Sequence, residues 1–224
     1  FDLYNVEEDI QKALQTRVAL KSGGYLMLDQ TEAMATIDVN TGSYVGGRTL
    51  EDTVFKTNME ATQVIARQLR LRNLGGIIII DFIDMQEAQH REEVMSQFER
   101  MLERDHAKTK ITQVSELGLV EMTRKRTRES LEHLLCESCS TCQGRGYVKT
   151  AETVCYEIFR EILRYARAFE SKSGFTVIAH PLVIDRLLTA EAPAVADLEH
   201  FIGRVIKFQV ENLYTQEQYD IILS

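Results

Sequence analysis

The sequence predicts a mixed α/β (α+β) fold, and three observations lead to this prediction. Residues 33–81 read as strand, loop, helix and strand, a crossover that favours a sheet with helices packed on it. A segment with little apolar content interrupts the chain at 136–146. Beyond it, helical and strand patterns alternate again over about 75 residues, which is enough for a small domain. We therefore expect two domains separated by a cysteine-rich segment.

The elements of the first half of the larger domain follow from apolar periodicity and turn signals. Apolar runs at 25–28 and 33–39 flank a polar turn and predict a hairpin. Thr49 and Asp52 have the spacing of a capping box, so a helix should begin there and end at the glycine pair before the next strand. The four isoleucines 77–80 form a short apolar run with polar ends, which is typical of a strand buried on both faces.

The remaining elements continue the alternation of helix and strand patterns. A charged amphipathic helix is expected at 87–105, and strands near 109–115 and 118–123 complete the larger domain. The small domain should contain a helix at 151–169, a strand at 175–179, helices at 181–189 and 194–203, and strands near 206–211 and 219–223.

Two carboxylates mark a candidate ion site. Asp38 and Asp81 each end a strand, on either side of one crossover, and ligand sites form outside the carboxyl ends of such strands. Neighbouring strands lie about 4.8 Å apart, so the pair could share one Mg²⁺, which prefers oxygen ligands. Asn40 could add a contact to a phosphate oxygen. The alternative is that both aspartates cap strand ends. Asp84 is interpreted as a helix N-cap, or as support for the site from outside its ligand set.

The cysteine-rich segment favours metal binding. Cys136, Cys139 and Cys142 form two overlapping C-x-x-C pairs, a spacing that lets two thiolates reach one tetrahedral Zn²⁺. Cys155 lies on an apolar helix stripe and is interpreted as a buried thiol. A single pair would coordinate only half of the ion, so a second copy of the chain could supply the other half. A redox pair would need to lie at a helix start after a strand, whereas glycines follow here.

Charge and apolar content limit the classes of protein to consider. No apolar stretch is long enough for a transmembrane helix, and no signal segment opens the chain. The net charge of −8 argues against a non-specific nucleic-acid binder, although residues 67–72 and 124–128 are locally basic. Each basic cluster, taken alone, reads as a solvated helix face.

Four segments together resemble the ribonuclease E/G family: "IDVNTG", "LRLRNLGGIIIIDFIDM", "GLVEMTRKRTRESLEHLLC" and "CQGRGYVKTAETVCYEI". The resemblance extends along essentially the whole chain. It implies a deoxyribonuclease I-like catalytic subdomain at 15–135, a zinc link at 136–146 and a small C-terminal domain at 147–224. Residues 1–14 resemble the last helix of a ribonuclease H-like subdomain. The chain therefore resembles the C-terminal half of such an enzyme, without its upstream RNA-binding and 5′-sensor domains.

The resemblance also implies roles for individual residues. Asp38 and Asp81 match the magnesium ligands of the family, and Asn40 matches the asparagine beside the scissile phosphate. Cys139 and Cys142 match a zinc-binding pair that two protomers share, so we expect a zinc-linked homodimer or a higher oligomer. Serine replaces the proline of the family's C-P-x-C motif, and Cys136 reads as an extra thiol. Candidate RNA contacts are Arg67, Arg70, Lys125 and Arg128, with an exposed charge or a structural ion pair as the alternative for each.

The implied activity is magnesium-dependent cleavage of single-stranded RNA, leaving 5′-phosphate and 3′-hydroxyl ends. Its setting would be rRNA processing and mRNA decay in the bacterial cytoplasm. One alternative is a zinc-linked dimerisation and scaffold fragment with negligible activity. Another is a magnesium-dependent phosphatase or phosphodiesterase for small molecules, which fits the carboxylates but not the arginine-rich helix or the cysteines.

Overall fold

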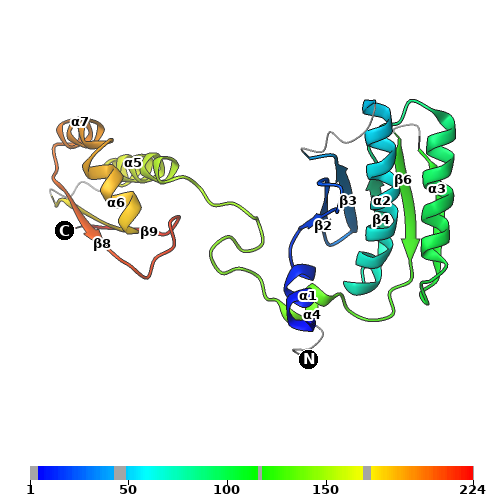
Figure 1. The fold of residues 1–224 in the computed structure, drawn as a ribbon. Helices are drawn as coiled ribbons and strands as arrows, with labels where there is room; N and C mark the ends of the chain where they lie inside the picture. Colours follow the sequence, from blue (N-terminus) through cyan, green and yellow to red (C-terminus); the bar gives the residue numbers. More distant parts are fainter. Residues whose placement is uncertain (1–4, 43–48, 116–117, 169–172, 224) are drawn as a thin grey trace. The chain divides into compact units, whose positions relative to one another are not determined.

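The computed structural model describes residues 5–42, 49–115, 118–168 and 173–223 (Figure 1). The chain forms two compact units, Phe1–Glu137 and Ser138–Ser224, and the boundary lies within the cysteine-rich segment. Among the described residues, no helix combines the length and apolar character needed to cross a membrane.

The first unit is built on a six-stranded mixed sheet. Its strands are β1 (Arg17–Ala19), β2 (Tyr25–Gln30), β3 (Met34–Asn40), β4 (Gly76–Asp81), β5 (Thr109–Val114) and β6 (Leu119–Arg124). They lie in the order β1-β2-β3-β4-β6-β5. β3 and β4 are parallel, while every other neighbouring pair is antiparallel. The predicted hairpin and crossover are therefore confirmed.

Two long helices cover one face of this sheet. α2 (Leu50–Leu71) makes the crossover between β3 and β4, and α3 (Ala88–Leu102) leads from β4 to β5; Figure 1 shows them side by side over the strands. Thr49 caps α2 as predicted, because its hydroxyl accepts a hydrogen bond from the Asp52 amide at 3.1 Å. The apolar stripes of both helices pack on alternate residues of the strands to form one core.

The opposite face of the sheet is open, and this corrects one prediction. The isoleucine strand is not buried on both faces: Ile78 and Ile80 are fully buried, but Ile77 is 47% exposed and Ile79 is partly exposed. The reason is that, among the described residues of this unit, helices cover only one side of the sheet, so alternate residues of β4 point away from the core. Met34, Thr36 and Asp38 of β3 show the same alternation.

Two short helices complete the first unit; the resemblance implied a helix within residues 1–14, whereas the second helix was not predicted. α1 (Val6–Ala13) lies in the segment that resembles the end of an upstream subdomain, and it buries only Ala13. α4 (Leu131–Leu135) is capped by the Ser130 hydroxyl, which accepts a hydrogen bond from the His133 amide at 3.3 Å. The three-residue strand β1 was also not predicted, because a run so short carries little periodicity.

The second unit packs helices on a three-stranded sheet. Its elements are α5 (Ala151–Ala168), β7 (Phe175–Ala179), α6 (Pro181–Leu188), α7 (Ala192–Ile202), β8 (Ile206–Val210) and β9 (Tyr219–Leu223). β7 is central, parallel to β8 and antiparallel to β9. Phe175, Val177 and Ala179 are fully buried against the helices. These bounds lie close to the predicted ones.

Candidate active site

Asp38 and Asp81 are direct neighbours in the sheet. They occupy paired positions in the register of the parallel strands β3 and β4, at the carboxyl ends of both. Both residues are exposed and lie on the open face of the sheet. Because parallel strands are about 4.8 Å apart, two such carboxylates can contact one cation. Among the described residues, neither forms an ion pair with a lysine, arginine or histidine.

Burial and neighbouring carboxylates set the electrostatic environment of Asp81. Burial raises the pKa of Asp81, and the negative charges of Asp38 and Asp84 raise it further. Asn40 orients the other carboxylate, because its Nδ2 donates a hydrogen bond of 2.9 Å to Asp38 Oδ2. A divalent cation would relieve the repulsion between the two carboxylates. The donor set, two carboxylates and one amide, suits Mg²⁺.

The helix layer fixes the segment that follows Asp81. Asn58 of α2 is fully buried and bonds both backbone groups of Ile83: its Nδ2 donates to the carbonyl oxygen at 2.8 Å, and its Oδ1 accepts from the amide at 3.1 Å. The Asn58 amide thus makes the two hydrogen bonds that a neighbouring strand would make with Ile83 if β4 continued. This contact was not predicted, because its partners lie far apart in the sequence.

A glycine fixes the segment beside Asn40. A Cβ atom on Gly24 would lie 2.6 Å from the Asn40 carbonyl oxygen, closer than real Cβ atoms approach. The β2–β3 hairpin therefore needs glycine here to keep Asn40 in its present position.

The prediction that Asp84 caps a helix was wrong, while its alternative role as support for the site stays a prediction. Helix α3 begins at Ala88 with Glu87 as its N-cap residue, so Asp84 does not cap it. The first turn is instead stabilised by Glu51 of α2, whose carboxylate accepts hydrogen bonds from the Gln86 and Glu87 amides at 3.1 and 3.3 Å. Asp84 remains exposed in the loop between β4 and α3.

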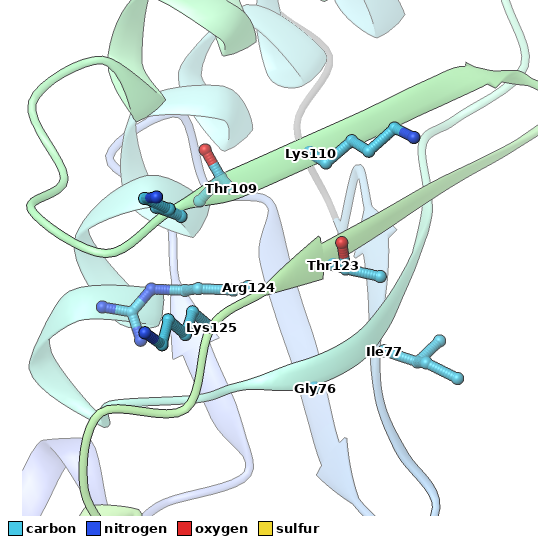
Figure 2. Close-up of a pocket in the computed structure, with 8 residues that line it drawn as sticks. Gly76, Ile77, Thr109, Lys110, Thr123, Arg124 and Lys125 are labelled. Atoms are coloured by element: carbon cyan, nitrogen blue, oxygen red, sulfur yellow. The ribbon is translucent and has the colours of Figure 1, made fainter.

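Cationic side chains gather at the other end of β4. A surface depression there is lined by Gly76, Ile77, Lys108, Thr109, Lys110, Thr123, Arg124 and Lys125. Figure 2 shows Ile77, Thr123 and Lys110 projecting to the same side of three adjacent strands. The register agrees, since Thr123 pairs with both Ile77 and Lys110. The depression therefore offers ammonium groups and hydroxyls on the open face.

The predicted RNA contacts divide between two places. Lys125 lines the cationic depression. Arg67 and Arg70 lie on α2, in the layer that covers the other face, and the Arg67 guanidinium is 3.6 Å from the Asp9 carboxylate. Arg128 is exposed, and its carbonyl oxygen accepts a hydrogen bond from Asn73 at 2.8 Å. The structure brings none of these three arginines to the carboxylates, and their role in RNA binding stays a prediction.

The cysteine loop presents two thiols together. Backbone amides of Cys142 and Thr141 hydrogen-bond the Cys139 sulfur and lower its pKa, which favours the thiolate that binds metals. Gln143 and Gly144 follow in left-handed conformations, and the Gln143 amide donates to the Cys139 carbonyl at 2.7 Å.

Cys155 is fully buried, as interpreted, and burial raises its pKa to about 11. In the described part of the chain, no three His, Cys, Asp or Glu side chains are placed to hold one metal ion. Cys139 and Cys142 thus offer two ligands where a structural zinc site usually needs four.

Comparison with known proteins assigns the chain to a family. The profile of the ribonuclease E/G family matches residues 1–127, more than half of the chain. The chain belongs to the ribonuclease E/G family. Its relatives include ribonuclease G of Salmonella typhimurium strain SL1344 (60% identical over 223 residues), of Escherichia coli strain K12 (59% over 223) and of Haemophilus influenzae (56% over 224).

The family match includes the carboxylates and the cationic depression but not the cysteines. Each of the three relatives aligns with 100% of this chain, whereas the chain spans only 45% of the length of each relative. What the relatives do as whole ribonucleases therefore enters below as a proposal for this member of the ribonuclease E/G family.

Proposed function

We propose that this chain carries the catalytic carboxylates of a magnesium-dependent endoribonuclease that cleaves single-stranded RNA. The observation that carries this proposal is the pairing of Asp38 with Asp81 on the open face of the sheet. Family membership supports the reaction class. The products would have 5′-phosphate and 3′-hydroxyl ends, and the substrates would be rRNA precursors and mRNA in the bacterial cytoplasm. The fold of the first unit would be deoxyribonuclease I-like.

The residues of the site have separate tasks in this proposal. Asp38 and Asp81 bind the cation, and Asn40 orients the Asp38 carboxylate through its 2.9 Å hydrogen bond. Asn58 holds the chain beyond Asp81 and so keeps that carboxylate at the strand end. The chemistry that magnesium supplies when bound is activation of a water nucleophile and neutralisation of charge on the phosphate.

The position of the site favours a polymer over a small molecule. Sites for small molecules are concave and bury most of the ligand, whereas Asp38 and Asp81 are exposed on a sheet face. The cationic depression lies at Ile77, about 13 Å from Asp81 along β4 at 3.3 Å per residue. Lys108, Lys110 and Lys125 would bind phosphates of the same strand whose scissile phosphate lies at the carboxylates.

The test is cleavage of a short 5′-phosphorylated RNA with and without Mg²⁺, using this chain and a full-length relative in parallel. Asp38→Asn and Asp81→Asn should abolish cleavage while RNA binding persists. Asp29→Asn is the matched control, because Asp29 is an exposed carboxylate on the same face of β2. Retention of most activity by either site variant would remove that aspartate from the mechanism. A chain that binds RNA but never cleaves it would favour the scaffold alternative.

The cysteine loop supports a second, structural task, which is dimerisation through shared zinc. The supporting observation is the pair Cys139 and Cys142, in which backbone amides hydrogen-bond the Cys139 sulfur. Two thiolates are half of the ligands of a tetrahedral zinc site. Solution mass should fall from dimer to monomer on zinc chelation, and Cys142→Ser should give the monomer directly. Cys136→Ser should leave the dimer intact. A dimer that survives both chelation and Cys142→Ser would exclude the zinc link.

A further inference from the structure

A cavity lies directly beyond the strand end that carries Asp81. It has a volume of about 340 Å³, and its lining comes from the segment after β4, from α3 and from the facing ends of β5 and β6. Residues that line it include Phe82, Asp84, Met85, Arg91, Met95 and Val120. Its size is at the lower end of pockets that bind small organic molecules, which suits one flat heterocycle.

Apolar side chains form about half of the cavity lining, and one of them is an aromatic residue held in place by packing. Phe82 is only 6% exposed, and its ring packs edge-on against Phe98 with centroids 5.9 Å apart. Met85 and Met95 add two thioether side chains, which are polarisable and pack well on aromatic rings. The apolar part of the lining can pack against the face of a nucleobase, whatever the identity of the base.

Two charged groups in the lining could select among nucleobases. The Asp84 carboxylate has no hydrogen-bond or ion-pair partner within the described part of the chain. Arg91 does not neutralise it, because its Nη1 donates to the carbonyl oxygens of Met85 at 2.6 Å and Gln86 at 3.4 Å. The guanidinium is thus fixed by backbone groups, while the carboxylate keeps its full acceptor capacity.

These groups are complementary to guanine. The Watson–Crick edge of guanine presents an acceptor, O6, followed by two adjacent donors, N1–H and the N2 amino group. A carboxylate accepts from both donors at once, and a guanidinium beside it can donate to O6. Adenine and cytosine place a ring nitrogen acceptor where Asp84 needs a donor, and uracil offers only one N–H between two carbonyls. Each of these three bases would leave a carboxylate oxygen unpaired.

We propose that this cavity, which we call the Asp84 cavity, binds a guanine base of the RNA next to the scissile phosphate. The inference rests on the proposed function, since it takes the occupant to be part of the strand that the carboxylates cleave. Asp84 lies three residues after Asp81 on the same chain segment, which Asn58 holds at Ile83. A base in the cavity and its own backbone phosphate at the carboxylates can therefore belong to one RNA strand.

The test uses methyl resonances of the methionines in the full chain, labelled with ¹³C and free of Mg²⁺. Met85 and Met95 line the cavity, whereas Met27 lies on β2 of the open face and Met122 is buried in the core. Guanosine 5′-monophosphate should shift Met85 and Met95 selectively. Inosine, adenosine and uridine monophosphates carry the same phosphate and should bind at least about tenfold more weakly. Equal binding of all four, or no shift at Met85 and Met95, would overturn the proposal.

Variants and an RNA probe complete the experiment. Asp84→Asn should reduce guanosine monophosphate binding at least about tenfold, and unchanged Met122 shifts would show that the fold persists. Glu99→Gln, which neutralises an exposed carboxylate elsewhere on α3, should bind normally. A uridine pentamer with one central guanine should shift Met85 and Met95 where an all-uridine pentamer does not. Binding of the mononucleotide without binding of this pentamer would assign the cavity to free nucleotides and overturn the RNA proposal.

The outcomes separate this inference from the proposed function. Cleavage that needs Asp38 and Asp81 but no guanine binding at Met85 and Met95 would refute the Asp84 cavity alone. Guanine binding that needs Asp84, in a chain that cleaves no RNA, would refute the nuclease function while the cavity remains.

Discussion

The two faces of the six-stranded sheet are formed by the same strands, and yet they differ in the exposure and the polarity of their side chains. On the covered face, Ile37, Ile78 and Ile80 are at most 1% exposed. On the open face, their sequence neighbours Asp38, Ile77 and Asp81 are exposed. Successive side chains along a strand point to opposite faces. One set of alternate residues therefore packs in the core, and the other set carries the candidate site. A substitution on the covered face should therefore affect stability, and one on the open face should affect cleavage.

Two aspartates show the same contrast in their electrostatics. Burial alone would raise the pKa of Asp105, but the hydrogen bond from the buried Arg124, together with others, lowers it below its usual value. For Asp81, burial and two neighbouring carboxylates act in the same direction and raise the pKa. The first carboxylate stabilises the fold. The second destabilises the fold when it is ionised, and the proposed cation would remove this effect.

The largest expected effect is the loss of the buried ion pair. Arg124 Nε lies 2.7 Å from Asp105 Oδ2, and the two side chains are 5% and 3% exposed. Arg124→Met should lower the free energy of unfolding by about 3–5 kcal/mol, because it leaves a buried charge unpaired. Urea denaturation at neutral pH measures this. Adding Asp105→Leu to Arg124→Met should recover most of the loss.

The same pair predicts a pH dependence. The folded pKa of Asp105 is lowered, so its contribution is complete above the unfolded pKa of about 3.9 and disappears as pH falls through the folded pKa. The stability difference between the native chain and Asp105→Asn should shrink as the medium is acidified below that point. A difference that stays constant into strong acid would contradict this assignment.

The next effect compares two neighbouring isoleucines. Ile78→Ala removes a fully buried side chain and should cost about 2–5 kcal/mol. Ile77→Ala makes the same chemical change on the open face, where the side chain is 47% exposed, and should cost less than about 1 kcal/mol. Chemical denaturation of both variants measures the ratio. Equal costs would mean that the open face is covered in solution.

A smaller effect should link the two faces. Asn58→Ala leaves both backbone groups of Ile83 without their partner and should cost about 1–3 kcal/mol. It should also raise the Mg²⁺ concentration needed for half-maximal cleavage, because the segment after Asp81 is released. Gln97→Ala is the control, since Gln97 Nε2 donates to the Met59 carbonyl at 2.8 Å and so joins α3 to α2 away from the site. It should destabilise the fold without changing the Mg²⁺ requirement.

The smallest expected effect is an increase, and not a decrease, in the free energy of unfolding. Asp81→Asn removes a charge whose partial burial, together with repulsion from Asp38 and Asp84, raises the pKa of Asp81, so the free energy of unfolding should rise at neutral pH without metal. The gain should be below about 1 kcal/mol, since the site is exposed and screened. Because the pKa of Asp81 is raised in the folded state, the stability difference between the native chain and Asp81→Asn should shrink on mild acidification as Asp81 takes up a proton. Saturating Mg²⁺ should reverse the ranking of the two.

Much of this arrangement could be predicted from the sequence, because it depends on local signals. The capping residue Thr49, the crossover and the strand ends at Asp38 and Asp81 all follow from spacing and periodicity. The burial of β4 was predicted wrongly, since four consecutive isoleucines do not show which of them a second layer covers. Asp84 was misplaced because α3 begins at Ala88, where Glu51 of another helix supports its first turn.

The supports of the site could not be predicted in the same way. Asn58 is one polar residue on a helix, and its role appears only when β4 places Ile83 beside it. Gly24 directly precedes β2, and its close approach to the Asn40 carbonyl depends on the hairpin geometry. Such contacts join segments that are distant in sequence, and a single sequence carries no signal for them.

The parallel pairing of β3 with β4 has a consequence for folding kinetics. The β2–β3 hairpin is a local contact that can form early, whereas Asp38 meets Asp81 only after the whole of α2 has been placed on the sheet. Intermediates that contain the hairpin alone would hold one carboxylate of the pair, so they could not bind the proposed cation with both. In refolding experiments, uptake of Mg²⁺ or Mn²⁺ should therefore follow hairpin formation and coincide with burial of Ile78 and Ile80, which makes the ion a kinetic reporter of the completed crossover.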